Sequence, residues 1–318
     1  MSLVTIEEIR AAADRISGLV TRTPLLPCAW AERARPLWVK AESLQPVGVF
    51  KQRGASNAIA VLDADQRSRG VVTHSSGNHA QALAWAARAA GVAATVVMPD
   101  SAPAVKVQAT RTLGAEVVIV PPAQRLSTAL QVVEDTGAVL VPPYDDAAVI
   151  AGQGTLGAEI AEDLPDVEAV LVPVSGGGLV SGVAVAVKAL CPHARVIGVE
   201  PELAGDLAAG FAAGERQTWP LEQTYQTVAD GLRVSPVGEL PWEHISAYVD
   251  DVVTVSEEAI LAAMRRLALG SRLVAEPSGA TAVAAYLEVP HRLPPGRTVA
   301  VLSGGNVDPA LLASVLAG

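Results

Sequence analysis

Short runs of β-branched and aliphatic residues alternate along this chain with longer segments whose apolar residues recur at helical spacing. In one such segment, Leu126, Ala129, Leu130 and Val133 stand at positions i, i+3, i+4 and i+7, which places them on one face of a helix. Eight short apolar runs are typical of buried parallel strands and cover residues 70–75, 94–99, 115–121, 138–143, 169–174, 195–200, 250–255 and 297–302. The alternation predicts an α/β fold in which helices flank open, parallel or mixed sheets, and the eight strands are enough for one sheet or for two.

The first four of these runs form a nearly self-contained block. We therefore predict a small domain over residues 70–147, inserted into a larger domain that residues 1–69 and 148–318 build together. In sheets of this kind, ligands bind beyond the carboxyl ends of the strands, often in the cleft between two domains. The loops at those strand ends are therefore the first candidates for a functional site.

Composition narrows the range of partners. Half of the 318 residues are hydrophobic, and the net charge of −10 argues against a nucleic acid or an anionic membrane as a partner. The two cysteines, Cys28 and Cys191, form neither a disulfide framework nor a metal-binding cluster, which favours a cytoplasmic location. The first residues are typical of an amphipathic helix rather than a signal peptide, and no apolar run reaches membrane-spanning length.

One lysine stands in an unusual place. Only four of the 23 basic residues are lysines, and one of them, Lys51, directly follows the apolar pair Val49 and Phe50. A desolvated lysine amine loses its proton readily and acts as a nucleophile, which an arginine does not do. The alternative is a surface lysine at the start of a helix, whose stem lies along apolar neighbours.

Polar loops follow two other predicted strands. The sequence Ser-Ser-Gly-Asn at 75–78 leads from a strand into a helical segment, where backbone N–H groups form an anion site. An ordinary capped turn is the alternative there. The strand at 297–302 ends in a turn that begins with Ser303, whose hydroxyl could bond a ring nitrogen, although by itself this is typical of a plain turn.

Three consecutive glycines, Gly176–Gly178, follow the strand at 169–174 and open a helix, so that successive N–H groups converge on an anion. Glycines in a row destabilise both helices and strands, which argues for a function. The loop does not match the dinucleotide-binding fingerprint, because Ser181 stands where the third glycine would be, and it lacks the lysine of a Walker loop. A single phosphate group suits it better.

A nucleophilic lysine, a phosphate-binding glycine loop and polar strand ends suit a cofactor with one aldehyde and one phosphate. Pyridoxal 5'-phosphate (PLP) has this chemistry. Seven motifs that cover essentially the whole chain resemble, in order and spacing, those of the serine/threonine dehydratase and serine racemase family: QPVGVFKQRGA, SSGNHAQAL, VIAGQGTLGAEI, PVSGGGLVSGVA, VEPELAGD, AEPSGA and LSGGNVD. The resemblance implies the tryptophan-synthase-β-like fold of fold type II PLP enzymes.

The resemblance also implies a role for individual residues. Lys51 resembles the lysine that forms a Schiff base with PLP and removes the substrate's α-proton, Asn78 the residue that hydrogen-bonds the pyridine hydroxyl, and Ser303 the partner of the pyridine nitrogen. The other implied cofactor contacts are Phe50, Ser175, Gly176, Gly177, Gly178 and Leu179. The substrate carboxylate is expected to bind Ser75, Ser76, Gly77, Asn78 and His79.

Ser76 bears on stereochemistry. In racemases of this family, a serine at this position faces the lysine across the cofactor and protonates the opposite face of the carbanion, whereas many dedicated dehydratases carry alanine or glycine. Ser76 is therefore a second expected catalytic residue and permits racemisation.

The sequence EPELAGD at 200–206 resembles the family's divalent-cation loop. The implied ligands are the carboxylates of Glu200 and Asp206 and the carbonyl of Ala204, hard oxygens that suit Mg²⁺ or Ca²⁺. The alternative is a pair of solvated acids on a surface loop.

Some positions depart from the family pattern. Val49 stands where the family usually has serine, and Gly48 where threonine dehydratases often have histidine; both lie near the expected substrate pocket. His79 favours the dehydratase branch over the cysteine-synthase branch, which carries threonine there. Arg125 is a candidate contact for the distal end of the substrate.

The prediction from these residues and the resemblance is a PLP-dependent lyase, a serine/threonine dehydratase that converts a β-hydroxy-α-amino acid to a 2-oxo acid and ammonia. The neutral hydroxyl of Ser303 favours this elimination. The alternatives are a serine-type racemase or dual racemase/dehydratase and, third, a non-enzymatic cofactor- or nucleotide-binding module. A homodimer is expected because dimers are common in the family.

Overall fold

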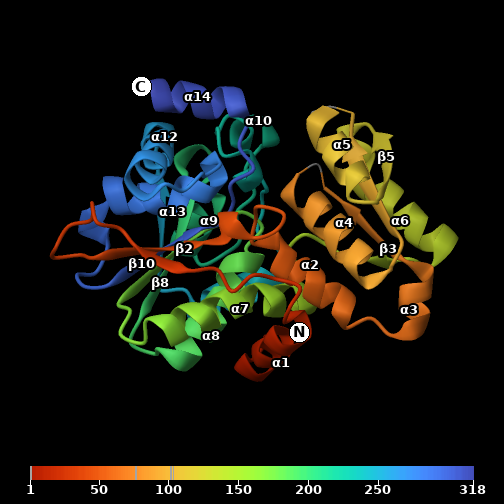
Figure 1. Cartoon of the computed structure of the whole chain (residues 1–318), viewed down its shortest axis with the longest axis horizontal. Helices are drawn as coiled ribbons and strands as arrows, with labels where there is room; N and C mark the ends of the chain where they lie inside the picture. Colours follow the sequence, from red (N-terminus) through yellow and green to blue (C-terminus); the bar gives the residue numbers. More distant parts are fainter. Residues whose placement is uncertain (1, 76, 101, 103) are drawn as a thin grey trace.

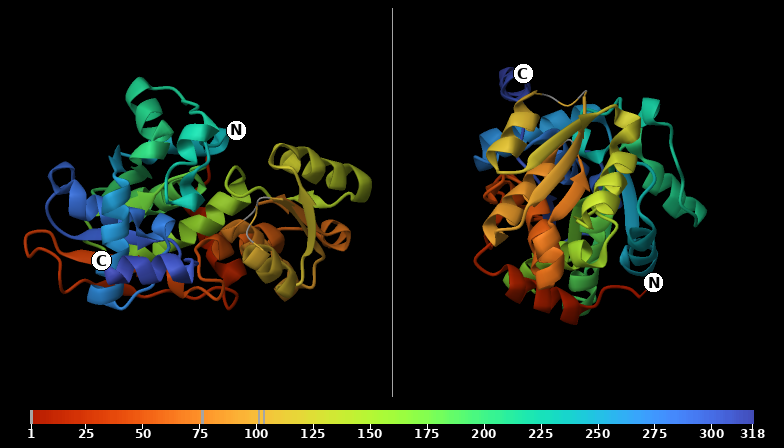
Figure 2. Two further views of the ribbon diagram at one scale, coloured as in Figure 1. Left: turned by 90° about the horizontal axis from the view of Figure 1, so that it is seen from above. Right: turned by 90° about the vertical axis from the view of Figure 1, so that its right-hand side faces the viewer.

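The computed structural model describes residues 2–75, 77–100, 102 and 104–318, and they form two α/β lobes, each built around its own sheet (Figure 1). The large lobe holds a six-stranded sheet made from residues 25–41 and 169–302, and the small lobe holds a four-stranded sheet made from residues 71–140. The two sheets lie side by side rather than stacked (Figure 2). The predicted α/β class with two flanked sheets is confirmed, while the predicted domain boundaries stay a prediction.

The sheet of the large lobe has the strand order β1-β2-β10-β7-β8-β9. Its neighbours are parallel except for β1 and β2, which are antiparallel. Strands β7 and β10 are buried along their whole length, as expected for central strands covered by helices on both faces. The strands are β1 (Leu25–Pro27), β2 (Leu37–Ala41), β7 (Ala169–Pro173), β8 (Arg195–Pro201), β9 (Asp251–Val255) and β10 (Thr298–Leu302).

Successive residues of β7 point to opposite faces of the sheet and pack in two different apolar clusters. Val170 and Val172 pack in the cluster that includes residues of α7, α8 and α11, whereas Leu171 packs in the cluster that includes residues of α12 and α13. This follows from the two-residue period of a strand. The helices of the large lobe are α1 (Ile6–Ile16), α7 (Ala147–Asp163), α8 (Gly178–Leu190), α9 (Asp206–Ala213), α10 (Leu221–Thr224), α11 (Glu239–Tyr248), α12 (Glu257–Arg266), α13 (Pro277–Glu288) and α14 (Pro309–Ala317).

The sheet of the small lobe is parallel throughout, with the order β5-β4-β3-β6. Helices α2 and α4 share one apolar cluster with it, and α6 packs in a second cluster. Helix α2 also contacts α7, so it lies between the two lobes. The elements are α2 (Lys51–Ala60), α3 (Ala64–Arg69), β3 (Val71–His74), α4 (Asn78–Ala90), β4 (Ala94–Pro99), α5 (Ala104–Thr112), β5 (Glu116–Val120), α6 (Arg125–Thr136) and β6 (Val139–Leu140).

All eight predicted strands are present, but the sequence analysis missed β1 and β2. Strand β1 has only three residues, and the run of β2 is interrupted by Lys40, which is fully buried because it pairs with Glu159. The run predicted at 138–143 is a strand only at its start, since Pro142 and Pro143 have no N–H to donate to a ladder. In the part of the chain that the structure describes, no helix is long and apolar enough to cross a membrane.

Candidate active site

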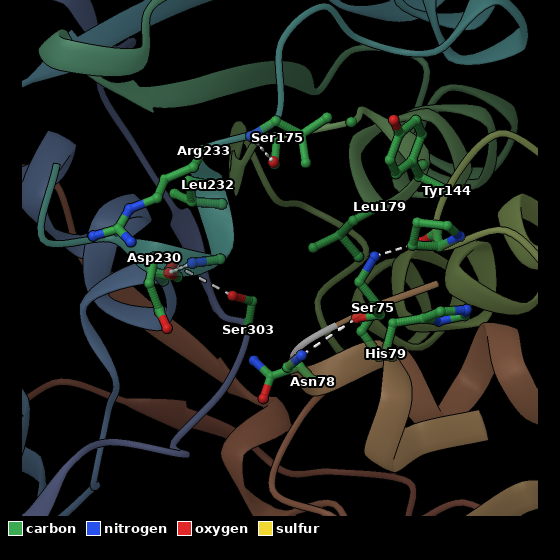
Figure 3. A pocket seen from close by; sticks show the side chains of 18 of the residues that line it. Ser75, Asn78, His79, Tyr144, Ser175, Leu179, Asp230, Leu232, Arg233 and Ser303 are labelled. Carbon is green, nitrogen blue, oxygen red and sulfur yellow. Dashed lines mark hydrogen bonds between the residues drawn. The ribbon is translucent and has the colours of Figure 1, made fainter. Parts of the chain in front are cut away.

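A cavity of about 370 Å³ lies between the two lobes, where β3, β7 and β10 end (Figure 3). It brings together most of the residues that the sequence singled out for cofactor and substrate. They are Phe50, Lys51, Ser75, Gly77, Asn78, His79, Ser175, Gly176, Gly177, Gly178, Leu179 and Ser303. Ser76, the second expected catalytic residue, lies outside the described residues.

Lys51 is the first residue of α2, and its amine faces the cavity. Its Nζ donates a hydrogen bond to the carbonyl oxygen of Pro143 at 2.5 Å and lies 5.2 Å from the centre of the Phe50 ring. Burial lowers the pKa of the amine from 10.5 to about 8. A substantial neutral fraction is therefore present near neutral pH, as a nucleophile requires, and the alternative of a surface lysine does not hold.

The segment before Lys51 is fixed by backbone pairing with the turn after β10. Phe50 donates from its N–H to the carbonyl oxygen of Ser303 at 3.0 Å, and Val49 forms an antiparallel bridge with Gly304. Val49, whose side chain replaces the usual serine of the family, is 1% exposed and packs away from solvent. The pairing places Lys51 and Ser303 on the wall of one cavity although 252 positions separate them in the chain.

The loop after β3 leads directly into α4, which begins at Asn78. Asn78 donates from Nδ2 to Oε1 of Glu276 at 2.7 Å, across the boundary between the lobes. Burial and the charge of Asp230 raise the pKa of Glu276 to about 7. The next residue, His79, is buried and neutral, because burial and the nearby Lys51 lower its pKa to about 3.

The glycine loop joins β7 to α8. Gly177 has φ of +90°, a conformation that favours glycine, and α8 begins at Gly178. A Cβ at Gly176 would clash with the ring of Tyr144, and one at Gly178 would lie 2.8 Å from the Tyr144 carbonyl oxygen. The loop therefore accepts no side chain, and its backbone N–H groups lie at the amino end of a helix, where anions bind.

Charged residues from both lobes also line the cavity. Lys106 of the small lobe pairs with Asp230 of the large lobe at 2.7 Å. Arg125 donates from Nε to the carbonyl oxygen of Pro122 at 3.1 Å, and its two Nη atoms have no partner among the described residues. Burial and the charge of Arg125 lower the pKa of His74, a cavity residue for which the sequence analysis assigned no role.

Comparison with known proteins identifies the family. Residues 16–304 match the family described as "Pyridoxal-phosphate dependent enzyme". The chain belongs to this family. An L-threonine ammonia-lyase of Thermotoga maritima is 44% identical over 312 residues, which cover 96% of this chain and 76% of that protein. A serine racemase of Arabidopsis thaliana is 43% identical over 309 residues, which cover 94% of this chain and 92% of that protein. The structure of maize serine racemase superposes with a TM-score of 0.92 at 39% identity, covering 99% of this chain and 98% of that one.

The cavity fits PLP. The bare glycine loop can accept a phosphate, and the Lys51 amine lies on the same cavity, as a PLP-dependent enzyme requires. Ser303 is 4% exposed, and its hydroxyl donates to the carbonyl oxygen of Ser278 at 3.5 Å. That long contact leaves the hydroxyl available to a ring nitrogen.

The residues expected to bind a cation lie outside this cavity. Glu200 and Asp206 are each 1% exposed, so they are not the solvated surface acids of the alternative interpretation. Glu200 accepts from the N–H groups of Leu207 and Ala208, whereas both carboxylate oxygens of Asp206 have no partner among the described residues. Burial raises the pKa of both groups, to about 6 for Asp206. In the described residues no group of three or more His, Cys, Asp and Glu side chains is placed to hold a metal.

Several cavity residues escaped the sequence analysis, chief among them Tyr144 and Glu276. Glu276 stands in the motif AEPSGA, which was noted as a match but not interpreted residue by residue. Tyr144 lies in a polar stretch between β6 and α7 that carries no pattern of its own. Only the fold reveals that its ring closes over the glycine loop.

Proposed function

We propose that this protein is a PLP-dependent ammonia-lyase that converts a β-hydroxy-α-amino acid, such as threonine or serine, to a 2-oxo acid and ammonia. The observation that carries the proposal is the half-buried amine of Lys51, with its pKa lowered to about 8, on one cavity with the glycine loop and the Ser303 hydroxyl. The sequence relationship to an L-threonine ammonia-lyase at 44% identity supports the same reaction.

PLP, when bound, supplies the electron sink that makes the substrate's α-proton acidic. We assign Lys51 to hold the cofactor and then, as a free amine, to accept that proton. The glycine loop binds the phosphate through its N–H groups, and Asn78 donates to the ring oxygen. Ser303 offers a neutral hydroxyl to the ring nitrogen and therefore no charge that would hold a proton there. This favours loss of the β-hydroxyl over a long-lived carbanion.

The substrate is held at its carboxylate by the loop from Ser75 to His79, at the amino end of α4. The α-proton moves to Lys51, the β-hydroxyl takes up a proton and leaves as water, and the released enamine is hydrolysed to the 2-oxo acid and ammonia. We assign His79 to none of these proton transfers, because burial lowers its pKa to about 3 and makes it a weak base.

A second candidate is racemisation, alone or together with elimination. The relationship to a serine racemase at 43% identity supports it, and Ser76 is the residue that we assign to protonate the opposite face. Replacing Ser76 by alanine is expected to abolish racemisation and to spare elimination of the L-substrate. An equal loss of both activities would show that Ser76 does not have this role.

We also propose that Glu200, Asp206 and the Ala204 carbonyl bind Mg²⁺ or Ca²⁺. Among the described residues these two buried carboxylates have no basic partner, so they need either protons or a cation, and oxygens are the ligands that both ions prefer. Because only two side chains contribute, water and backbone oxygens must complete the coordination. The expected homodimer and cytoplasmic location stay predictions.

The test of the main proposal is a panel of L- and D-serine, threonine and 3-hydroxyaspartate, scored for release of oxo acid and ammonia and for inversion. We expect oxo acid from at least one L-substrate and none from Lys51→Ala. Borohydride reduction followed by peptide mapping should place the cofactor on Lys51. Labelling of another residue, or oxo-acid release by Lys51→Ala, would overturn the proposal.

A further inference from the structure

The side-chain amide of Asn78 is held at both ends. Its Nδ2 donates to Glu276 Oε1 at 2.7 Å, and its Oδ1 accepts from Nδ2 of Asn306 at 2.8 Å. Asn306 Nδ2 also donates to the carbonyl oxygen of Val47 at 3.1 Å. These bonds form one chain that runs from Val47 through two asparagines to a buried carboxylate.

The groups at the two ends of this chain fix its direction. A backbone carbonyl only accepts, so Asn306 must turn its amide nitrogen toward Val47 and Asn78. Since Asn306 donates to Asn78 Oδ1, the Asn78 nitrogen is left to face Glu276, whose Oε1 accepts whether or not the other carboxyl oxygen carries a proton. The orientation of the Asn78 amide is therefore determined by its partners, and one Nδ2 hydrogen remains unused by the chain.

That remaining hydrogen is the donor that a cofactor ring oxygen needs, and Asn78 lines the cavity. If the amide were turned over, an oxygen would face the ring oxygen, and two acceptors would meet. We propose that Glu276 and Asn306 are positioning residues that hold the Asn78 amide with its free N–H toward the ring oxygen of PLP. This inference rests on the proposed function, because it takes the cofactor to bind in this cavity.

Two glycines make room for the positioning side chains. A Cβ at Gly304 would clash with Glu276 Oε1, and a Cβ at Gly48 would lie 2.5 Å from Asn306 Oδ1. Gly48 also has φ of +73°, which favours glycine. The glycines of two separate motifs thus have one physical purpose, to let the ends of the hydrogen-bond chain approach Asn78.

The chain also joins the lobes. Asn78 opens α4 of the small lobe, Glu276 precedes α13 and Asn306 follows β10 in the large lobe. The contact of Glu276 with Asn78 is partly buried, since Glu276 is 4% exposed while Asn78 lines the cavity, and a hydrogen bond shielded from water is stronger than one in water. The cofactor-facing amide therefore depends on residues from both sides of the cavity.

The test uses the holoenzyme and reads the bound cofactor rather than turnover. The variants are Glu276→Leu, which removes the acceptor, Glu276→Gln, which keeps one, and Asn306→Ala, which releases the other end of the amide. Glu258→Leu, an exposed carboxylate on α12, is the control. For each protein the ratio of the visible to the near-ultraviolet band of bound PLP and the Kd for PLP are measured, together with the unfolding temperature of the PLP-free form.

We expect Glu276→Leu and Asn306→Ala to change the band ratio and to weaken PLP binding on the order of tenfold, the effect of one hydrogen bond to a charged or strongly polar group. Glu276→Gln should restore most of the wild-type spectrum, and Glu258→Leu should leave it unchanged. Asn306 is only partly buried, so we expect Asn306→Ala to fold. If Glu276→Leu does not fold, Asn306→Ala still tests the inference.

Wild-type spectra and Kd values in both Glu276→Leu and Asn306→Ala would overturn the inference, as would a Glu276→Gln spectrum as altered as that of Glu276→Leu. A lower unfolding temperature without a spectral change would show a structural role only, and would overturn it too. Failure of the wild-type protein to bind PLP at Lys51 would instead overturn the proposed function, so the two failures are distinguishable.

Discussion

The amine of Lys51 donates to the backbone carbonyl of Pro143 at 2.5 Å, and among the described residues no carboxylate forms a salt bridge with it. A carbonyl offers only a partial charge, so the desolvation of the ammonium is not repaid and its pKa falls to about 8. The cavity thus prepares the amine for attack before any cofactor arrives.

This relationship predicts the pH dependence of cofactor capture. Because only the neutral amine attacks an aldehyde, the rate at which PLP-free protein takes up PLP should rise about tenfold per pH unit below pH 8 and level off above it. The change in visible absorbance after rapid mixing measures this rate. A rate that keeps rising toward pH 10 would mean that the amine has its ordinary pKa and that the pocket does not desolvate it.

Helix α2 carries Arg53, which belongs to a buried ion cluster, and we expect a substitution of Arg53 to lower the stability of the fold strongly. Arg53, two residues after Lys51, is fully buried and pairs with Glu42 at 2.8 Å and with Glu159 at 2.6 Å. Replacing Arg53 by methionine leaves a buried carboxylate without its partner, which should lower the free energy of unfolding by roughly 3–5 kcal/mol. Denaturant unfolding of the PLP-free protein measures the change.

The chain offers a matched control for that experiment. Arg22 also pairs with two carboxylates, of Glu162 and Asp163, but its side chain is 51% exposed. Replacing Arg22 by methionine should cost less than about 1 kcal/mol, since water solvates the charges that it leaves. An equal decrease in the free energy of unfolding of the two variants would show that the buried cluster around Arg53 stabilises the fold no more than an exposed ion pair does.

The proposed cation site predicts stabilisation by Mg²⁺ or Ca²⁺. A cation that binds only the folded protein should stabilise it by roughly 3 kcal/mol at about one hundred times its Kd. The unfolding temperature should rise when the ion is added to chelator-treated protein, and Asp206→Asn should remove the response. Glu202→Gln, on an exposed neighbour in the same loop, should keep it. A wild-type response in Asp206→Asn would exclude this site.

Arg125 predicts a preference among substrates. Its guanidinium lies on the cavity and has two Nη atoms without partners among the described residues, so a distal carboxylate of the substrate can pair with it. Arg125→Leu should therefore lower kcat/KM for 3-hydroxyaspartate at least about tenfold more than for threonine, the effect of a charged hydrogen bond. Arg111→Leu, on the exposed face of α5, should change neither value. Equal losses on both substrates would contradict this role.

The strands and the cofactor loops could be predicted from the sequence because their signals are local. Runs of valine and alanine mark β7 and β10, and three glycines mark the phosphate loop whatever the rest of the chain does. Strand β2 could not be predicted in this way, because it contains the charged residue Lys40. Burial of Lys40 is favourable only because Glu159, 119 residues away in the chain, pairs with it. A charged residue within a short apolar run looks like an interruption until the fold supplies its counter-charge.

Within the active site, too, local sequence patterns reveal some residues and not the contacts between distant ones. Lys51, Asn78 and Ser303 each stand in a motif with a recognisable pattern, and the structure places all three on one cavity. Tyr144 and the contact between Asn78 and Glu276 depend on how the two lobes meet, which no window of sequence describes. Residues that act through tertiary contacts therefore remained invisible, although Glu276 stood within a recognised motif.

The bridge between Val49 and Gly304 has a consequence for how the gene can change. This single bridge, together with the hydrogen bond from Phe50 to Ser303, sets how far the Lys51 amine stands from the Ser303 hydroxyl. It therefore fixes the distance between the two groups that we assign to opposite parts of a rigid cofactor ring. A substitution that fits its surroundings keeps this spacing, although Gly304 itself accepts no Cβ. One inserted or deleted residue shifts the pairing by one position and turns each side chain to the wrong neighbour. We therefore expect these two segments to tolerate many changes of side chain better than a change of length.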